Sequence, residues 1–301
     1  MYAAQHRANA KGSWSRVRLE LTEGFSDTRW VVTVPAPQLS LIVPVYNEST
    51  RLPASLRAMG AYLAERPFDS EIVIVDDGSS DGTLGVAEEI ARTLAVPVRL
   101  LRCAVNRGKG HALKVGFAVA RGDWLVFTDC DLSTPLEEMG KFIDQLEAGS
   151  DLVIGSRRRA GADVMRHQPR LRENLGAVFT WIIRVLIADV TDVTCGFKAY
   201  RGEVGRDVFS RLRIDDWSFD AELLLIARER GYQVVEVPVR WQDHSGSKVR
   251  LMRDVVVSLI GIAKIHFSHA LGRYDSTTEP GQFTEVDPCG TEPEPSSGET
   301  L

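Results

Sequence analysis

The sequence predicts an α/β fold in which helices flank a mostly parallel central sheet. From Gln38 onward, short β-prone apolar runs alternate with amphipathic helical stretches, which is the pattern of repeated strand–helix crossovers. The chain has 301 residues, of which 44% are hydrophobic and 26% are charged, as is usual for a globular protein with a sizeable core. We therefore expect one large α/β domain rather than a repeat array or a fibrous protein.

The elements follow one another in regular order. Five apolar runs are expected to be strands, at 39–45, 71–75, 96–101, 124–127 and 152–154. Between them, apolar residues recur at helical spacing in 51–65, 81–94, 109–121 and 136–147, which supplies one crossover for each pair of strands. A further amphipathic helix begins at Phe219 and is stopped by Gly231.

The segments outside this pattern have a different composition. Residues 1–37 are expected to be an extension, either a peripheral hairpin or disordered. Residues 275–301 contain seven acids, no Lys or Arg and four prolines, which predicts a disordered acidic tail. The domain between them, 38–274, holds 31 basic and 31 acidic residues and no aromatic stacking motif, so it is not expected to bind nucleic acid.

Polar side chains follow three of the predicted strands at their carboxyl ends. In open α/β sheets this edge is where ligands bind. A single Asp at such a place is usually a helix cap or part of a turn, but that explanation does not predict acids clustered at one edge. The residues concerned are Tyr46, Asn47, Glu48, Asp76, Asp77, Asp129 and Asp131.

The Asp129-Cys130-Asp131 sequence places two carboxylates at the end of one strand. Alternate side chains can reach one ion, and a hard divalent cation prefers a few carboxylates together with phosphate oxygens and water. Such a cation offsets the charge that develops on a departing diphosphate. Two aspartates after a strand also occur for capping reasons, so the motif alone is weak support. No two of the four cysteines are spaced as CxxC, which excludes a zinc knuckle of that type.

A series of short motifs identifies the family that the sequence resembles. Over about 38–270 the chain is similar to family 2 glycosyltransferases of GT-A fold, and within them to the dolichyl-phosphate and polyprenyl-phosphate sugar synthases. The DLSTP segment resembles the β-glucosyltransferase branch. The motifs, in order, are PVYNE (44–48), IVDDGSSDGT (74–83), NRGKGHAL (106–113), TDCDLSTP (128–135), GSRR (155–158), CGFKAYR (195–201) and HSGSK (244–248).

The resemblance implies roles for individual positions around the donor. Its nucleotide-sugar site would comprise a base pocket at Pro44, Tyr46 and Glu48 and nucleoside-contacting acids at Asp76 and Asp77. The implied cofactor is Mg²⁺ or Mn²⁺, held with the diphosphate by Asp129 and Asp131, with Ser133 where some relatives have a further ligand. Lys109 has two interpretations of equal weight, a lysine that approaches the nucleotide and a surface lysine at a helix start.

Basic residues are expected to meet the phosphates. Arg157 matches a phosphate-contacting arginine of the family, and Arg170 or Arg172 and Lys248 resemble further partners of donor or acceptor phosphate. The alternative for the arginine-rich stretch is a solvated surface loop. Asp220 lies where relatives that glycosylate hydroxyls have a general base. Because a phosphate acceptor is already ionised, we expect a positioning role, or only a favourable place near the helix N-terminus.

Two amphipathic stretches, 171–187 and 251–271, predict contact with an anionic membrane surface. Each is equally well explained as a core helix packed on the sheet. Neither reaches the roughly 20 apolar residues of a spanning helix, so a membrane-protein partner could supply the anchor. The protein is expected at the cytoplasmic, inner face of the membrane.

Taken together, these patterns predict an inverting glycosyltransferase that moves a hexose, from UDP-glucose, onto a polyprenyl or dolichyl phosphate. The closest alternatives change a substrate, to GDP-mannose as donor or to a soluble hydroxyl as acceptor. An alternative of another class is a nucleotide-sugar-binding protein without turnover, which the presence of Asp129, Asp131, Arg157 and Lys248 disfavours.

Overall fold

A computed structural model of the chain describes residues 18–22, 29–33, 36–166, 180–184, 187, 189–243 and 251–288. Within this part, the central sheet has eight strands in the order β10-β7-β9-β6-β3-β4-β5-β12. Their bounds are β3 Leu39–Val45, β4 Ser70–Asp76, β5 Val98–Cys103, β6 Trp124–Thr128, β7 Leu152–Ser156, β9 Phe197–Arg201, β10 Val234–Pro238 and β12 Phe283–Val286.

The sheet is mostly parallel, as predicted. β3 pairs in parallel with both β4 and β6, β4 with β5, and β7 with β10. β9 lies between β6 and β7 and runs antiparallel to both, so β6 and β7 point the same way. The five predicted strands are all present. Those after the first are displaced or extended by one or two residues at their ends.

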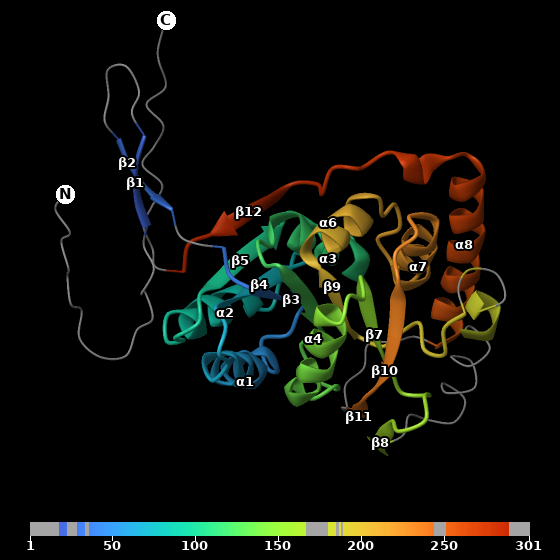
Figure 1. Ribbon diagram of the computed structural model, residues 1–301, viewed down its shortest axis with the longest axis horizontal. Helices are drawn as coiled ribbons and strands as arrows, with labels where there is room; N and C mark the ends of the chain where they lie inside the picture. The colour runs from blue at the N-terminus through green and yellow to red at the C-terminus, as the bar shows by residue number, and fades with distance from the viewer. Residues whose placement is uncertain are drawn as a thin grey trace, which may run out of the picture.

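Helices cover both faces of the sheet (Figure 1). One core lies under α1 Leu52–Ala64, α2 Thr83–Ala91 and α4 Met139–Glu147, which follows the short 3₁₀ turn η1 Leu136–Glu138. The other lies under α3 Lys109–Val119, α6 Gly202–Ser210 and α7 Phe219–Glu229. In this second core the Phe117 and Phe209 rings stack with centroids 3.7 Å apart. Burial on both faces explains why the strands are continuous apolar runs.

The segment after α8, Leu251–Ala270, differs from the predicted disordered tail. It continues through η2 Arg273–Asp275 and runs back along the molecule to form β12, antiparallel to β5 at the sheet edge (Figure 1). Glu285 accepts a 2.7 Å hydrogen bond from Arg99 Nε, and Thr278 Oγ1 donates one of 3.0 Å to the Ser210 carbonyl. Composition predicted disorder because the acids of the segment have no basic residues near them in the sequence. In the fold, a basic side chain of the main domain, Arg99, pairs with one of these acids. Residues 289–301 lie outside the described part.

Two small strand pairs lie outside the central sheet. β1 Arg18–Thr22 and β2 Arg29–Thr33 pair antiparallel, which corresponds to the hairpin alternative for the N-terminal extension. β8 Asp163–Arg166 and β11 Arg240–Gln242 pair in parallel. None of the helices in the described residues is long and apolar enough to cross a membrane.

Candidate active site

The strand ends bring the predicted site residues to one edge of the sheet. β3, β4, β5 and β6 are mutually parallel, and β7 points the same way, so the residues that follow each of them lie at a common edge. Tyr46 to Glu48 follow β3, Asp77 follows β4, Lys109 begins α3 after β5, Asp129 and Asp131 follow β6, and Arg157 follows β7. The predicted clustering is therefore present in the fold.

The loops after β3 and β4 hold each other through side-chain hydrogen bonds. The Asn47 amide donates to Ser79 Oγ at 2.8 Å, and the Ser80 amide donates to Asn47 Oδ1 at 2.9 Å. The Glu48 carboxylate takes two hydrogen bonds from the Arg51 guanidinium, at 2.6 and 2.7 Å, and this contact raises the pKa of Arg51. Asn47 has φ of 52°, a left-handed conformation that Asn tolerates better than most residues. Tyr46 is 40% exposed beside this loop.

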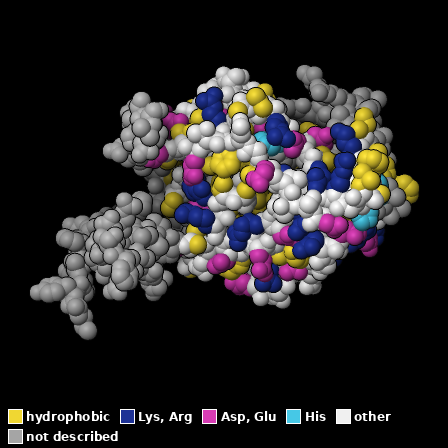
Figure 2. Space-filling model, turned by 90° about the horizontal axis from the view of Figure 1, so that it is seen from above, with side chains coloured by type: hydrophobic (Ala, Val, Ile, Leu, Met, Phe, Trp, Pro, Cys, Tyr) yellow, Lys and Arg dark blue, Asp and Glu magenta, His cyan; other side chains and the backbone are white. Residues whose placement is uncertain are grey.

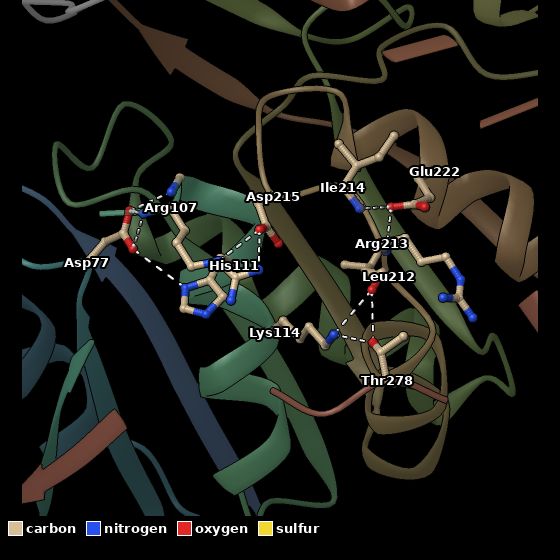
Figure 3. Close-up of polar contacts among 11 residues, drawn as sticks. Asp77, Arg107, His111, Lys114, Leu212, Arg213, Ile214, Asp215, Glu222 and Thr278 are labelled. Carbon is tan, nitrogen blue, oxygen red and sulfur yellow. Dashed lines mark hydrogen bonds and ion pairs between the residues drawn. The ribbon is translucent and has the colours of Figure 1, made fainter. Parts of the chain in front are cut away.

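Asp76 and Asp77 are both buried but differ in their contacts. Asp76 Oδ1 accepts the Ser79 amide at 2.9 Å, while Oδ2 is buried without a hydrogen-bond partner. Asp77 accepts the backbone amides of Arg107 and Gly108, at 3.1 and 2.7 Å, and so fixes the loop that leads into α3 (Figure 3). Asp76 Oδ2 is thus an acceptor available to a ligand, and the Asp77 carboxylate is largely used within the protein.

Lys109 points into the site, so its interpretation as a surface lysine is wrong. Its Nζ lies 2.6 Å from Asp129 Oδ1, and the side chain is 13% exposed. The rings of Phe127 and Trp217 lie 5.4 and 5.8 Å from the same nitrogen. Burial alone would lower the pKa of Lys109, but the nearby carboxylates of Asp129 and Asp220 raise it instead. Lys109 therefore stays a cation beside the predicted diphosphate site.

The Asp129 and Asp131 carboxylates lie in a tight turn that follows β6. Asp131 Oδ1 accepts the amide of Ser133 at 3.0 Å, and Leu132 between them has φ of 51°, an uncommon value for a non-glycine residue. Gly196 leaves the space that the Asp129 carboxylate fills, because a Cβ built at position 196 would collide with Asp129 Oδ2. The Asp129 and Asp131 carboxylate oxygens are ligands that a hard cation such as Mg²⁺ or Mn²⁺ prefers. A side chain at position 196 would occupy the place of the Asp129 carboxylate.

Arg157 is held by an acid that sequence reasoning missed. Its Nε and Nη2 donate to the two oxygens of Asp192, both at 2.7 Å, and Nη2 also donates to Thr194 Oγ1 at 2.9 Å. Burial alone would lower the pKa of Arg157, but Asp192, which is fully buried, raises it. The guanidinium is therefore oriented before any phosphate arrives. Arg170, Arg172 and Lys248 lie outside the described residues.

Asp220 lies in the first turn of α7, as expected, but it also forms a buried ion pair. Its Oδ1 is 2.5 Å from Lys198 Nζ on β9, and the two side chains are 5% and 0% exposed. Burial raises the pKa of Asp220 even though Lys198 and Lys109 lower it. Lys198 also donates to the Cys195 carbonyl at 2.9 Å. The signal for this pair was a lysine within the apolar CGFKAYR strand, since a buried lysine requires an acid partner.

Comparisons with known proteins identify the family of the chain. Residues 40–209 match the family model described as "Glycosyl transferase family 2". A dolichyl-phosphate beta-glucosyltransferase of Dictyostelium discoideum is 33% identical over 246 residues, which is 78% of this chain and 75% of that protein. Proteins of the same description from Drosophila melanogaster and Homo sapiens are 34% and 32% identical, covering 75% and 71% of this chain and 76% and 70% of their own lengths.

Solved structures share the fold at lower identity. Glucosyl-3-phosphoglycerate synthase from Mycobacterium tuberculosis, in complex with Mn²⁺, UDP-glucose and phosphoglyceric acid, has a TM-score of 0.57 at 20% identity, covering 76% of this chain and 79% of that one. A Pyrobaculum calidifontis mannosyltransferase with GDP-mannose and Mn²⁺ has a TM-score of 0.51 at 22% identity, covering 82% and 67%. These likenesses establish the GT-A architecture.

Proposed function

The chain belongs to glycosyl transferase family 2 and is a glycosyltransferase, and on this premise we propose that it moves glucose from UDP-glucose onto a polyprenyl phosphate such as dolichyl phosphate. The product would be a β-linked lipid-phosphate sugar. The observation that carries the proposal is the match to dolichyl-phosphate beta-glucosyltransferases over about three quarters of both chains. The strand-end cluster of Asp129, Asp131, Lys109 and Arg157 supports it, because it gathers the charges that a diphosphate requires.

The nucleotide sugar would bind across the ends of β3, β4 and β6. Pro44, Tyr46 and Glu48 would border the base, and the unpartnered Asp76 Oδ2 would accept a hydrogen bond from the nucleoside. Asp129 and Asp131, with Ser133, would hold Mg²⁺ or Mn²⁺. That ion supplies charge neutralisation for the departing diphosphate. Lys109 adds a second positive charge that does not depend on the metal.

The acceptor phosphate would be guided by the basic side of the site. Its oxygen attacks the anomeric carbon from the face opposite UDP, and the bond from that carbon to the UDP oxygen breaks with its electron pair leaving on UDP. A phosphate acceptor is ionised near neutral pH, so no proton has to be removed. Arg157, and with it Arg170, Arg172 and Lys248, would bind acceptor or donor phosphate. Catalysis would come from positioning and charge stabilisation.

Asp220 acts in this scheme as a positioning residue rather than a base. Its carboxylate is paired with Lys198, and Lys109 lies close enough for both acids, Asp220 and Asp129, to raise its pKa. The alternation of Lys198, Asp220, Lys109 and Asp129 fixes Lys109 between two carboxylates. This arrangement would keep the Lys109 ammonium at the diphosphate during the reaction.

One face of α8 supports docking on an anionic membrane. Ile262 and Ile265 are buried, whereas Ile260, Phe267 and Leu271 are 51%, 62% and 53% exposed, with Lys264 exposed among them. Hydrophobic and basic side chains appear together at this end of the molecule in Figure 2. The helix thus packs on the domain and also presents an apolar face with a cation. Peripheral binding, directly or beside a membrane-protein partner, would bring the site to a lipid phosphate at the cytoplasmic face.

The test is product formation from radiolabelled UDP-glucose or GDP-mannose with a short polyprenyl phosphate, with and without Mg²⁺ or Mn²⁺. Label from UDP-glucose should pass into the organic phase in a metal-dependent way. Label from GDP-mannose in that phase would replace the donor, and label in an aqueous conjugate would replace the acceptor. Binding of the nucleotide sugar without any transfer would overturn the proposal. Asp129→Asn, with the fold checked by circular dichroism, should abolish transfer.

A further inference from the structure

Three buried side chains with metal-ligating atoms, none of them Asp129 or Asp131, converge in the fold. Asp77 follows β4, Cys103 ends β5, and His111 lies in the first turn of α3. One oxygen, sulfur or nitrogen atom from each lies within 4.8 Å of those of the other two. Among the described residues, this is the one group of at least three His, Cys, Asp or Glu side chains that meets that condition.

His111 contributes two buried nitrogens that no protein group among the described residues satisfies by a hydrogen bond. Its side chain is 3% exposed, and both ring nitrogens are buried without a hydrogen-bond partner. Nδ1 faces Asp77 Oδ1 across 3.6 Å, which is longer than a hydrogen bond (Figure 3). The other nitrogen faces the C-terminal segment, since a Cβ built at Gly281 would lie 2.8 Å from it. Buried polar atoms without partners are rare in folded proteins and indicate a missing ion or water.

The distance between Asp77 Oδ1 and His111 Nδ1 is the distance expected for two ligands of one metal ion. Zn²⁺ binds nitrogen and oxygen at about 2.0–2.2 Å and sulfur at about 2.3 Å, so tetrahedral ligands lie roughly 3.3–3.7 Å apart. The Asp77 and His111 atoms already have this spacing, and the cluster would contract by about 1 Å to close on an ion. The mixed nitrogen, oxygen and sulfur set favours Zn²⁺ over Mg²⁺, which prefers oxygen alone.

We propose that Asp77, Cys103 and His111 form a binding site for a divalent cation of the Zn²⁺ class, distinct from the Asp129 and Asp131 carboxylates. A carboxylate and a thiolate together neutralise the two charges of the ion, and a water completes its coordination. Bound metal would tie the end of β4 to β5 and to the start of α3, directly beside Asp76. The inference stands on these contacts alone and does not depend on the proposed sugar transfer.

The test uses the full chain, freed of metal with a chelator and titrated with Co²⁺ in excess Mg²⁺. One equivalent of Co²⁺ should bind and produce a cobalt–thiolate charge-transfer band in the near ultraviolet, which Zn²⁺ should displace. Cys103→Ser should abolish the band, and His111→Ala should weaken Co²⁺ binding at least about 10-fold. Cys195→Ser, a buried cysteine outside the cluster, and Asp129→Asn and Cys289→Ser should each leave the band unchanged.

Two measurements, each made on the unmodified chain and on Cys103→Ser, can overturn the proposal. If saturating Co²⁺ gives no thiolate band, or if the band survives Cys103→Ser, the three residues do not bind a metal together. A second measurement uses thermal unfolding. Zn²⁺ should raise the unfolding temperature of the unmodified chain, and it should raise that of Cys103→Ser by much less. Equal shifts in the two proteins would also exclude the site.

Discussion

Replacing Lys198 with Met should destabilise the protein strongly, because it leaves the carboxylate of Asp220 buried without its counter-ion. The pair is 2.5 Å apart and the two side chains are 0% and 5% exposed, so water cannot take over the role of the ammonium. Breaking a buried ion pair from one side costs about 3–5 kcal/mol of unfolding free energy. For a domain of this size, about 2–4 °C are lost per kcal/mol, so the unfolding midpoint should fall by about 6–20 °C.

The assay is urea and thermal unfolding of three variants followed by circular dichroism. Lys198→Met with Asp220→Leu replaces both charges by apolar groups and should recover most of the loss. Arg201→Met, which removes solvent-accessible ion pairs with Glu203 and Asp151, should cost less than the loss of the buried pair, about 1 kcal/mol. If Lys198→Met alone costs no more than Arg201→Met, or if the double variant recovers nothing, the buried pair does not hold this part of the fold together.

The pH dependence of that loss has a definite sign. Burial raises the folded-state pKa of Asp220 above its unfolded value, so the contribution of this group to stability is fully present below the unfolded pKa. It is lost as pH rises through the folded pKa. Without Lys198 the ionised form of Asp220 is even less stable in the folded protein. The unfolding free energy lost in Lys198→Met should therefore become smaller as pH is lowered from 8 to 5. A deficit that is constant with pH would mean that lost packing, not charge, causes the effect.

Three further predictions concern the site, acid stability and membrane binding. Gly196→Ala should lower kcat at least about 100-fold with little change in unfolding temperature, because the alanine Cβ would displace the Asp129 carboxylate. Retained activity would show that this carboxylate can move without loss of function. Burial alone would raise the pKa of Glu138, but its cationic partners lower it. The ionised Glu138 therefore stabilises the fold above its unfolded pKa of about 4.3, and this contribution is lost as pH falls through the folded pKa. Glu138→Gln should make the free energy of unfolding, measured in urea, fall less steeply at acid pH. Phe267→Asp should reduce sedimentation with anionic liposomes at low salt, whereas Val105→Asp, equally exposed on another part of the surface, should not, and equal loss in both would mean that α8 is not the docking face.

Sequence periodicity was sufficient for the main architecture. The strand 39–45 was predicted to the residue because both of its faces are buried and its apolar run is therefore unbroken. The placement of Asp76 and Asp129 at one sheet edge followed from the parallel order of their strands, whereas Arg157 was expected at the site from the family resemblance. β12 could not be predicted in this way, because its place depends on pairing with β5 and on Arg99, nearly 200 residues earlier in the chain.

The partners of the site residues were the part that the sequence did not reveal. Arg157 is paired with Asp192, and Lys109 with Asp129, across 35 and 20 residues of chain. Local patterns carry no information on which acid a given cation meets, because that is decided by how the strands are ordered in the sheet. Lys198 is the exception, since a lysine inside an apolar strand already implies a buried acid.

The alternation of charge around Lys109 explains how the site can gather several carboxylates without losing stability. Asp129 and Asp220 would repel each other at close range in a partly buried setting. Lys109 contacts Asp129 and lies within electrostatic range of Asp220, and Lys198 neutralises Asp220 from the other side. Two cations thus balance two anions, and Asp131 remains as additional negative charge at the mouth. A divalent cation would neutralise the negative charge of Asp131. The charge arrangement that stabilises the protein without a ligand therefore also favours the binding of a metal-bound diphosphate.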